Sequence, residues 1–466
     1  MNPIRTFLIC GMLLLWVPCL STGGQISSAK QKTWTLAFYL AGDNSMEYAQ
    51  ARNFEEIIRT AGSLEEMDVV VFFDRDMKFT RDNPVTSWKG TRVFDVRKGL
   101  PSPARHPVRI EIPETIGHPR FNREIADRIQ TREERDFLLK CYRRQGAFWH
   151  LNPLGKKERD RLFTVLSEKT GYLLPLHDKG PVNLDATDAA TLRRYICYVK
   201  DNFHSRYYAL IMAGHGNGWM GNVSPGLTEG SKDPETYSKS FSVAHIQRAL
   251  QDEPVDVLIM DACNMGDLES LWAMKDAAQY LVLNQIPIPR SGLDYTIFLR
   301  RLRNRNGLSP EQLSLETVHA YEDTYGRKSY PVCVSAFRTG TGLLRFAASF
   351  DRFMQNPDNQ RAVRQAADRA LRVRHVDGNT VAAADLIQFC RDLDQKTLED
   401  AVSGQHGFQI YCFRHRTEVN GISFYLPISE TIFQETYEPY RQTVFAKSFP
   451  HGWSRFLPSL WDTNSR

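Results

Sequence analysis

The chain lacks several features that would have assigned it to a common class. Its eight cysteines form no C-x-x-C pair and no cluster with histidine, so no zinc site is predicted. Beyond the first residues, no apolar run is long enough to span a bilayer. The formal net charge of +5 is weak for 466 residues, and no stripe of Lys and Arg alternates with aromatic residues, which argues against a nucleic-acid partner. The sequence also has no internal repeat and no low-complexity tract.

The remaining composition is that of an ordinary globular protein. Charged residues make up 24% and apolar residues 42% of the chain. Basic pairs such as Arg143-Arg144 and Lys156-Lys157 lie among acids, which predicts solvated faces. A chain of this length can bury a large core, in one large domain with additions or in two domains.

Residues 1–23 have the pattern of a targeting segment. Arg5 supplies a positive start, residues 7–17 form an apolar stretch, and small residues follow at 18–23. Because the stretch is too short for a comfortable membrane span, a cleaved signal peptide is predicted, with a secreted or periplasmic protein after its removal. An uncleaved anchor and a lipid anchor at Cys19 are the alternatives, although the residues before Cys19 match a lipobox poorly.

Two short motifs each follow an apolar run with the length and β-branched character of a buried strand. Residues 207–213 lead into Gly-His-Gly-Asn-Gly-Trp, which contains His215. Residues 255–260 lead into Asp-Ala-Cys-Asn-Met-Gly, which contains Cys263. Because sites form at the carboxyl ends of parallel strands, two neighbouring strand ends would bring the imidazole to the thiol. A buried Cys and a turn His that never meet are the alternative.

A His–Cys pair can carry out nucleophilic catalysis. A free thiol is mostly protonated at neutral pH, whereas the thiolate is the nucleophile. A nearby imidazole can accept that proton and later protonate a leaving amine. The backbone N–H groups near Gly216 and Cys263 are candidates for an oxyanion hole.

These motifs resemble those of the clostripain family of cysteine peptidases, relatives of the caspases, gingipains and legumains. His-Gly-Asn-Gly-Trp and Asp-Ala-Cys-Asn-Met-Gly match the family's two motifs. Residues 34–44 resemble its first strand and acidic loop, and residues 421–427 resemble its late strand. The resemblance implies a caspase-like α/β fold, a mostly parallel sheet flanked by helices, with His215 and Cys263 as the catalytic dyad. The resemblance implies that the enzyme requires no cofactor, and it is compatible with bound calcium.

The resemblance also implies where substrates bind. Clostripain-like peptidases cut after Arg or Lys, and Asp261 occupies a position that belongs to their basic-residue pocket. Asp294 is a second candidate for substrate binding. The alternative for Asp261 is that it caps the following helix or bonds to the loop. The chain departs from the family at two places near that pocket, with Asn284-Gln285-Ile286 in place of Ser-Glu-Glu and Gly-Leu-Asp-Tyr at residues 292–295 in place of Gly-Trp-x-Tyr.

The segment 221–240, between His215 and Cys263, is polar and contains Lys232 and Lys239. Clostripain-like enzymes are often cut by themselves between the two catalytic residues, so these lysines are candidate autoprocessing sites. An ordinary surface loop would have the same composition.

The predicted organisation is a signal peptide at 1–23, a catalytic domain at 24–300 with a helical insertion at about 100–180, and a C-terminal α+β region at 301–466 packed on it. Helical spacing within the insertion covers residues 121–149 and 156–170. The predicted strands are 35–41, 69–73, 92–96, 207–213, 255–260, 280–283, 332–337, 409–413 and 422–426. The predicted helices are 45–61, 187–202, 264–277, 311–325, 343–354, 359–370 and 382–396.

Cysteine counting is consistent with export but leaves the pairing open. Two of the eight cysteines leave with the signal, and if Cys263 is a free nucleophile five remain. Cys197, Cys333 and Cys412 lie inside apolar runs and are predicted to be small core residues.

The predicted function is a secreted cysteine endopeptidase that acts on protein or peptide substrates. The second class is a relative with a different role on the same scaffold, either a binding module or an acyl transferase. An intact dyad argues against an inactive binding module.

Overall fold

The computed structural model describes most of the chain from residue 31 onward. The described residues are 31–64, 66–75, 90–96, 115–117, 132–145, 148–155, 157–158, 161, 184–222, 241–305, 307–373 and 382–461. The predicted signal peptide and the two candidate autoprocessing lysines lie outside them. Contacts separate Met1–Gln31 from a unit formed by Lys32–Arg466, and the unit that begins at Lys32 is the one described below.

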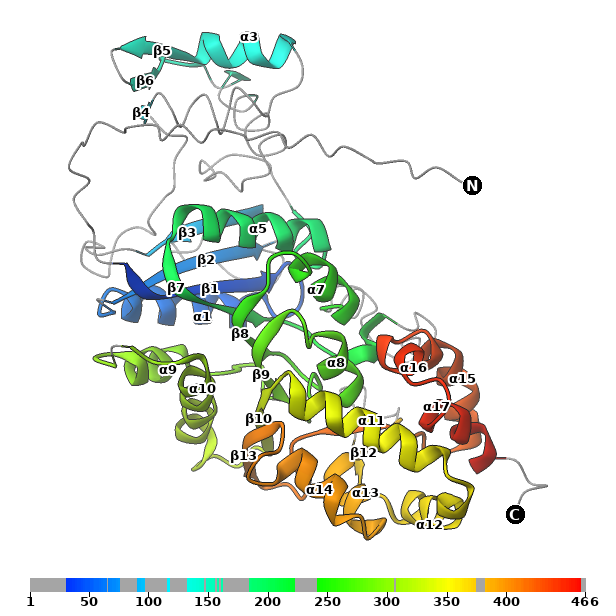
Figure 1. Ribbon diagram of the computed structural model, residues 1–466. Coiled ribbons are helices and arrows are strands. Elements are labelled where there is room, and N and C mark those ends of the chain that lie inside the picture. The colour runs from blue at the N-terminus through cyan, green and yellow to red at the C-terminus, as the bar shows by residue number, and fades with distance from the viewer. Residues whose placement is uncertain are drawn as a thin grey trace, which may run out of the picture. The chain divides into compact units, whose positions relative to one another are not determined.

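An eight-stranded sheet in the order β13-β10-β9-β8-β7-β1-β2-β3 organises the fold (Figure 1). Its strands are β1 (Lys32–Gly42), β2 (Met67–Arg75), β3 (Gly90–Asp95), β7 (Ser205–Ala213), β8 (Val255–Asp261), β9 (Ala278–Asn284), β10 (Val332–Arg338) and β13 (Gln409–His415). The five central strands β2, β1, β7, β8 and β9 pair in parallel. Antiparallel strands continue the sheet at both edges. The predicted mostly parallel sheet is confirmed.

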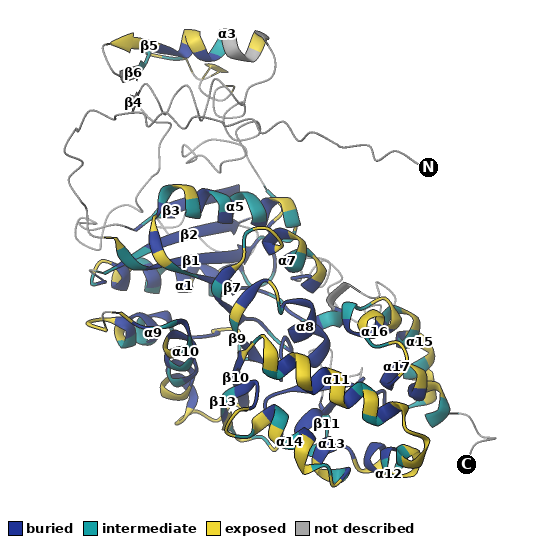
Figure 2. Cartoon of the chain, viewed as in Figure 1, coloured by how far each residue is buried: buried dark blue, intermediate teal, exposed yellow. Residues whose placement is uncertain are grey.

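Both faces of the sheet are buried, as the apolar strand sequences require (Figure 2). Neighbouring residues of β1 alternate between two cores, because successive side chains of a strand point to opposite faces. Leu36 and Phe38 belong to one core, and Ala37 and Tyr39 belong to the other. A strand that is buried on both faces therefore carries apolar residues at consecutive positions, without alternation of apolar and polar residues.

Helices cover each face. The core that includes Phe38 is closed by α1 (Glu47–Ala61), α9 (Tyr295–Leu302) and α10 (Pro310–Tyr325). The core that includes Tyr39 is closed by α5 (Ala189–Asn202), α7 (Val243–Leu250), α8 (Leu268–Ala273) and α11 (Thr341–Gln355). The prediction of helices on both faces is confirmed.

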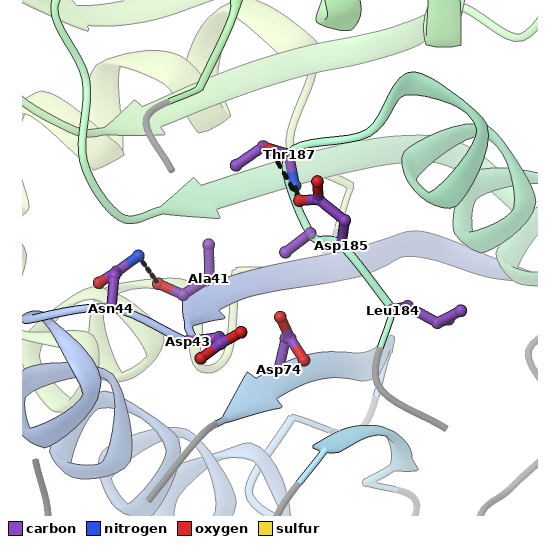
Figure 3. A pocket seen from close by; sticks show the side chains of 8 residues that line it. Ala41, Asp43, Asn44, Asp74, Leu184, Asp185 and Thr187 are labelled. Atoms are coloured by element: carbon purple, nitrogen blue, oxygen red, sulfur yellow. Dashed lines mark hydrogen bonds between the residues drawn. The ribbon is translucent and has the colours of Figure 1, made fainter. Parts of the chain in front are cut away.

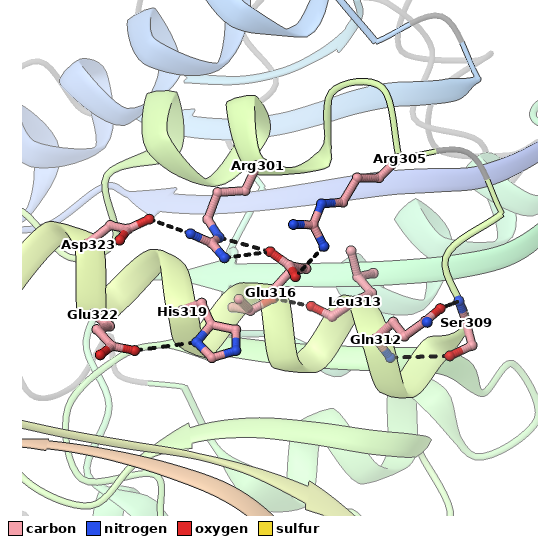
Figure 4. Close-up of polar contacts among 10 residues, drawn as sticks. Arg301, Arg305, Ser309, Gln312, Leu313, Glu316, His319, Glu322 and Asp323 are labelled. Carbon is pink, nitrogen blue, oxygen red and sulfur yellow. Dashed lines mark hydrogen bonds and ion pairs between the residues drawn. The ribbon is translucent and has the colours of Figure 1, made fainter.

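Polar contacts hold α9 against α10 (Figure 4). Glu316 on α10 accepts from Arg301 at 2.9 Å and from Arg305 at 2.6 Å. At the start of α10, the Ser309 hydroxyl accepts from the backbone of Gln312 at 3.2 Å, and the Gln312 side chain accepts from the Ser309 backbone at 2.9 Å. This reciprocal cap satisfies two helix-end donors and sets the angle at which α10 leaves the loop.

The C-terminal region contributes to the same sheet and adds a smaller one. Strands β10 and β13 form one edge of the large sheet, and β11 (Arg372–Val373), β12 (Ala383–Asp385) and β14 (Ser423–Tyr425) form an antiparallel sheet of three strands. The remaining helices there are α12 (Gln360–Arg369), α13 (Leu386–Asp392), α14 (Lys396–Ser403), α15 (Glu430–Arg441), α16 (Val444–Ser448) and α17 (Trp453–Phe456), with short 3₁₀ segments η3 (Pro357–Asn359) and η4 (Leu457–Leu460).

Two predicted helices are wrong in extent. The helix predicted at 264–277 is reduced to α8, because Asn264 adopts a φ of 51° and Asp267 caps the helix by accepting from the Ser270 amide. The helix predicted at 382–396 begins as strand β12 and becomes helical only after Asp385, which caps α13. In both cases an Asp followed by an apolar residue marks the start.

The insertion contains a helix, as predicted, and also strands. Helix α3 (Arg132–Cys141) is followed by β5 (Tyr142–Gln145) and β6 (Phe148–Leu151), which form a three-stranded sheet with β4 (Thr115–Gly117). The strands were not predicted, because Tyr-Arg-Arg-Gln has no apolar alternation. Arg143 and Arg144 are exposed, as predicted. In the described part of the chain, no helix combines the length and the apolar character that crossing a bilayer requires.

Candidate active site

The sheet brings the two motif loops to the same edge. Strand β7 ends at Ala213, which pairs with Asp261 at the end of the neighbouring strand β8. The Gly214 amide continues this pairing to the Asp261 carbonyl at 3.4 Å. His215 and Cys263 each lie two residues beyond this pair. The strand register therefore places the two predicted catalytic residues on adjacent loops at equivalent positions.

Gly216 lets these loops approach closely. A Cβ at this position would lie 2.8 Å from the Cys263 carbonyl oxygen, 2.8 Å from the Ala262 Cβ and 2.9 Å from the Met265 sulfur. Such distances leave no room for a side chain, so only glycine fits without displacing the nucleophile loop. The backbones of Gly216 and Cys263 thus lie side by side, while their use as an oxyanion hole stays a prediction.

His215 is half-buried and meets a residue that the sequence did not single out. Its Nε2 lies 3.0 Å from the Ser45 hydroxyl, which comes from the loop between β1 and α1. Strand β1 is the neighbour of β7 on the side opposite β8. A hydroxyl at the end of the adjacent strand can orient the imidazole. The sequence signal was the acidic loop after the first strand, but a single Ser within it has no distinctive pattern.

Cys263 is also half-buried, and the segment after β9 touches its sulfur. The Ile288 amide donates to Sγ at 3.4 Å, and the thiol donates to the Ile288 carbonyl at 3.7 Å. Burial raises the pKa of the Cys263 thiol to about 11, the Ile288 amide opposes this, and the charge of Asp261 adds to it. The thiol therefore favours its protonated form at neutral pH in this arrangement, and a base must remove the proton before or during attack.

Asp261 is buried and surrounded by neutral donors. Its carboxylate accepts from the Tyr321 hydroxyl at 2.6 Å, from the Tyr295 hydroxyl at 2.9 Å and from the Leu293 amide at 3.1 Å. Burial raises its pKa, and these hydrogen bonds counteract the rise. Among the described residues, no Lys, Arg or His forms an ion pair with it. In the described residues Asp261 is therefore a buried carboxyl group at the strand end that only neutral donors contact.

The second candidate, Asp294, has a local structural role. Its carboxylate accepts from the Ile297 amide at 2.9 Å and caps α9. It directly follows Leu293, whose amide donates to Asp261. A role of Asp294 in substrate binding stays a prediction.

Asn284 and Gln285 do not lie at a surface that a substrate could touch. Both have an exposed fraction of 0%. The Gln285 side chain donates to Asp385 at 2.9 Å and accepts from the Gly421 amide at 2.5 Å. Their side chains are therefore buried beside the candidate pocket: Asn284 donates at 3.4 Å to the Tyr321 hydroxyl, which itself donates to Asp261. The difference from the family motif is a difference in the core.

Replacing Gln285 by Glu should destabilise the protein, because a second carboxylate would face Asp385 out of contact with water. An uncompensated buried charge costs about 3–5 kcal/mol, and we expect that loss in urea unfolding at pH 7. The loss should shrink at low pH as the new carboxyl is protonated. As a matched control, Gln388→Glu changes a half-buried residue of α13 and should cost less than about 1 kcal/mol. Equal stability of the two variants at pH 7 would refute the buried contact.

A separate cavity lies beside the end of β1 (Figure 3). It measures about 250 Å³, and its lining includes Asp43, Asp74 and Asp185. The Thr91 hydroxyl donates to Asp74 at 2.8 Å, and the Thr187 hydroxyl donates to Asp185 at 2.7 Å. Across the ranges that the structure describes, no group of three or more His, Cys, Asp or Glu residues has metal-binding geometry.

All six cysteines from Cys141 onward are free thiols. Of the three cysteines predicted to be core residues, Cys333 is buried, whereas Cys197 and Cys412 are only partly buried; Cys390, for which no prediction was made, is buried. The sulfurs of Cys333 and Cys412 lie 3.8 Å apart. This contact lowers the pKa of the Cys412 thiol, whereas the pKa of the Cys263 thiol is raised.

Comparison with known proteins shows to which family the chain belongs. The model of the clostripain family, peptidase family C11, matches residues 38–451. The chain belongs to the clostripain family. This is a family of cysteine peptidases, and the match spans both motif loops and the C-terminal region. No curated protein sequence matches the chain significantly.

Solved structures of C11 proteases share the fold. An inactive zymogen C11 protease from Parabacteroides distasonis is 14% identical, with 90% of this chain and 98% of that chain covered and a TM-score of 0.58. A secreted C11 cysteine protease from Bacteroides thetaiotaomicron, in complex with an irreversible peptide inhibitor, is 13% identical, with coverage of 89% and 98% and a TM-score of 0.55. The caspase-like fold implied by the sequence is thereby confirmed.

Proposed function

We propose that this member of the clostripain family is a secreted cysteine endopeptidase in which His215 and Cys263 form the catalytic dyad. The observation that carries the proposal is the register of β7 and β8, which places both residues two positions beyond a paired strand end. The close approach of Gly216 to the Cys263 backbone supports it. The peptide inhibitor bound to the B. thetaiotaomicron protease supports a peptide substrate.

In this mechanism the Cys263 sulfur attacks the carbonyl carbon of a peptide bond. His215 accepts the thiol proton and then donates it to the leaving amine, which yields a thioester. Water, activated by His215, hydrolyses the thioester and regenerates the thiol. Because burial raises the pKa of the thiol, the attack needs a base to remove its proton, and His215 is the residue we assign to that role.

Cleavage after Arg or Lys is the second part of the proposal. Asp261 lies two residues before Cys263, is buried, and receives only neutral donors within the described residues. A guanidinium or ammonium group that approached this carboxylate would neutralise a charge that burial makes costly. The charge of Asp261 therefore favours a cationic side chain next to the scissile bond.

Secretion is the third part. The charged start, apolar stretch and small residues of the segment 1–23 have the order of a signal peptide. The B. thetaiotaomicron relative is described as secreted. Comparison of the mature N-terminus with the encoded sequence, by mass spectrometry of the exported protein, tests this part.

An acyl transferase is the second candidate function, because the same thioester can react with an amine in place of water. The half-buried position of Cys263 under Ile288 favours this candidate, since a shielded thioester survives longer. Incubation of an arginine ester with and without an amino-acid amide separates the two. Free acid as the main product in both mixtures supports the peptidase, and a ligated product as the main species supports the transferase.

Autoprocessing between the two catalytic residues is expected if the enzyme cuts after lysine in its own chain. The candidate positions are Lys232 and Lys239, which lie outside the described residues. Purified wild type should then run as two fragments on a reducing gel, split next to one of these lysines, and the Cys263→Ala protein should remain one chain. Two fragments in both proteins would indicate a contaminating protease. A single chain in fully active wild type would show that cleavage is not required.

A further inference from the structure

Two buried carboxyl groups occupy the start of α8, directly after the nucleophile loop. The exposed fractions of Asp267 and Glu269 are 4% and 1%. The attack on the substrate does not use either group. Buried acids without a cation are costly to keep, so their contacts indicate what they stabilise.

Asp267 joins the nucleophile loop, which contains Cys263 and follows β8, to the histidine loop, which contains His215 and follows β7. Its carboxylate accepts from the Ser270 amide and from the Ser270 hydroxyl, both at 2.7 Å. It also accepts from the backbone amide of Trp219, in the 3₁₀ segment η2 (Gly218–Asn222) that begins three residues after His215. Gly218 has a φ of 55°, and a Cβ there would collide with the Asp267 carboxylate. The histidine loop therefore lies directly on this side chain.

Glu269 joins the same helix to β14. Its Oε1 accepts from the Tyr425 amide at 3.0 Å, while its Oε2 is buried without a hydrogen-bond partner among the described residues. The Trp219 ring packs edge-on against the Tyr425 ring, with centroids 5.3 Å apart. The histidine loop, the nucleophile helix and β14 thus meet around two acids.

We propose that Asp267 is a positioning residue, which fastens the histidine loop to the nucleophile loop, and that Glu269 beside it works as a neutral, protonated acid. This inference rests on the proposed function, because it assigns how His215 is held relative to Cys263. A protonated Glu269 removes one of two like charges from a buried site, which favours the charged form of Asp267 as the acceptor of its three donors.

The electrostatics of the site agree with this assignment. Burial raises the pKa of Asp267 to about 7, and burial together with Asp267 raises the pKa of Glu269 to about 8. The Tyr425 and Tyr440 hydroxyls also face this site: burial raises the pKa of both, and the charge of Glu269 adds to the rise. On the helices packed against α8, Arg248 of α7 and Lys447 of α16 are exposed.

The pH dependence follows from the sign of the Glu269 shift. A carboxyl whose pKa is higher in the folded state than in the unfolded state binds its proton more tightly when folded. Its contribution to stability is complete at low pH and is lost as the pH rises through about 8. Wild-type protein should therefore lose thermal stability as the pH rises from the ordinary pKa of a Glu side chain to about 8. Glu269→Gln, an isostere of the protonated acid, should lose less stability over the same pH range.

The test combines three variants with readouts that do not all need activity. Asp267→Asn keeps a helix cap but not the charge, and we expect kcat for an arginine ester to fall roughly ten- to a hundredfold, as for loss of a charge-assisted bond, with KM nearly unchanged. Selective ¹⁵N-histidine NMR should show a displaced His215 resonance in Asp267→Asn, assigned by its absence from His215→Ala. Val402→Ala is the matched control, since this buried side chain lies in α14, which packs on α11, α13 and β13.

Each outcome decides one point. An unchanged His215 resonance and unchanged kcat in Asp267→Asn overturn the positioning role, and so does an equal effect of Val402→Ala. A parallel loss of stability with pH in wild type and Glu269→Gln overturns the protonated acid. If wild type hydrolyses no ester, the proposed peptidase function fails, yet the resonance and the stability profiles still test the loop contact.

Discussion

Replacing Cys263 by Ala should abolish peptide hydrolysis while leaving the fold intact. The sulfur is the only atom lost, and it lies half-buried beyond the end of β8. Without a nucleophile no thioester forms, so we expect kcat to fall by about 10⁴-fold or more. Stability in urea should change by less than about 1 kcal/mol. Initial rates on an arginine ester, at matched concentrations of folded protein, measure the effect.

The matched control for this prediction is Cys412→Ala. Cys412 is the cysteine whose thiol pKa is lowered by its contact with Cys333, so it is the competing candidate for a reactive thiol. We expect Cys412→Ala to retain the activity of wild type. If Cys412→Ala lost activity and Cys263→Ala stayed fully active, the nucleophile would be Cys412 in β13. That result would reject the dyad.

Replacing Asp261 by Asn should remove the preference for cationic substrates. The carboxylate is buried, and in the described residues only neutral groups donate to it. Losing a charge-assisted pair with Arg or Lys costs about 1.5–3 kcal/mol, so the ratio of kcat/KM for an Arg substrate over a Leu substrate should fall roughly ten- to a hundredfold. The new amide also mismatches one donor, so stability should fall by about 1–3 kcal/mol.

The ratio separates specificity from a structural role. A purely structural Asp261 would lower the rates on Arg and Leu substrates by the same factor and leave their ratio unchanged. Asp294→Asn serves as the comparison, because Asn also caps helices and Asp294 bonds to the Ile297 amide. An unchanged substrate ratio in this variant would confine the specificity to Asp261, and a reduced ratio would give Asp294 a part in substrate binding. Equal rates on Arg and Leu substrates in wild type would reject the basic pocket altogether.

The fold could be read largely from the sequence because apolar runs dominate it. The segments 209–213 and 257–260 are apolar at every position, which indicates strands that are covered on both faces. The glycine and acidic residues that follow these runs indicated the edge of the sheet at which the candidate catalytic residues lie. The mostly parallel sheet came from the resemblance, and the strand order was not predicted, since the sequence alone does not specify which strands are neighbours.

The site could be predicted only where a residue type is distinctive. His215 and Cys263 stand in short motifs, but Ser45 is an unremarkable hydroxyl whose importance depends on the adjacency of β1 and β7. Asn284 and Gln285 follow a strand end, where substrate contacts are common, yet β10 and the loop before β14 cover them. Asp267 lay inside the helix predicted at 264–277, and nothing in the sequence placed Trp219 against it.

The most direct measurement of the central claim is the site of covalent modification by an arginyl chloromethyl ketone. This electrophile requires both a reactive thiol and a place for a cationic side chain. Tryptic peptide mapping of wild type should locate the label on Cys263, with His215→Ala labelled much more slowly at pH 7. Labelling of Cys412 or another thiol in place of Cys263, at a rate independent of His215, would contradict the account.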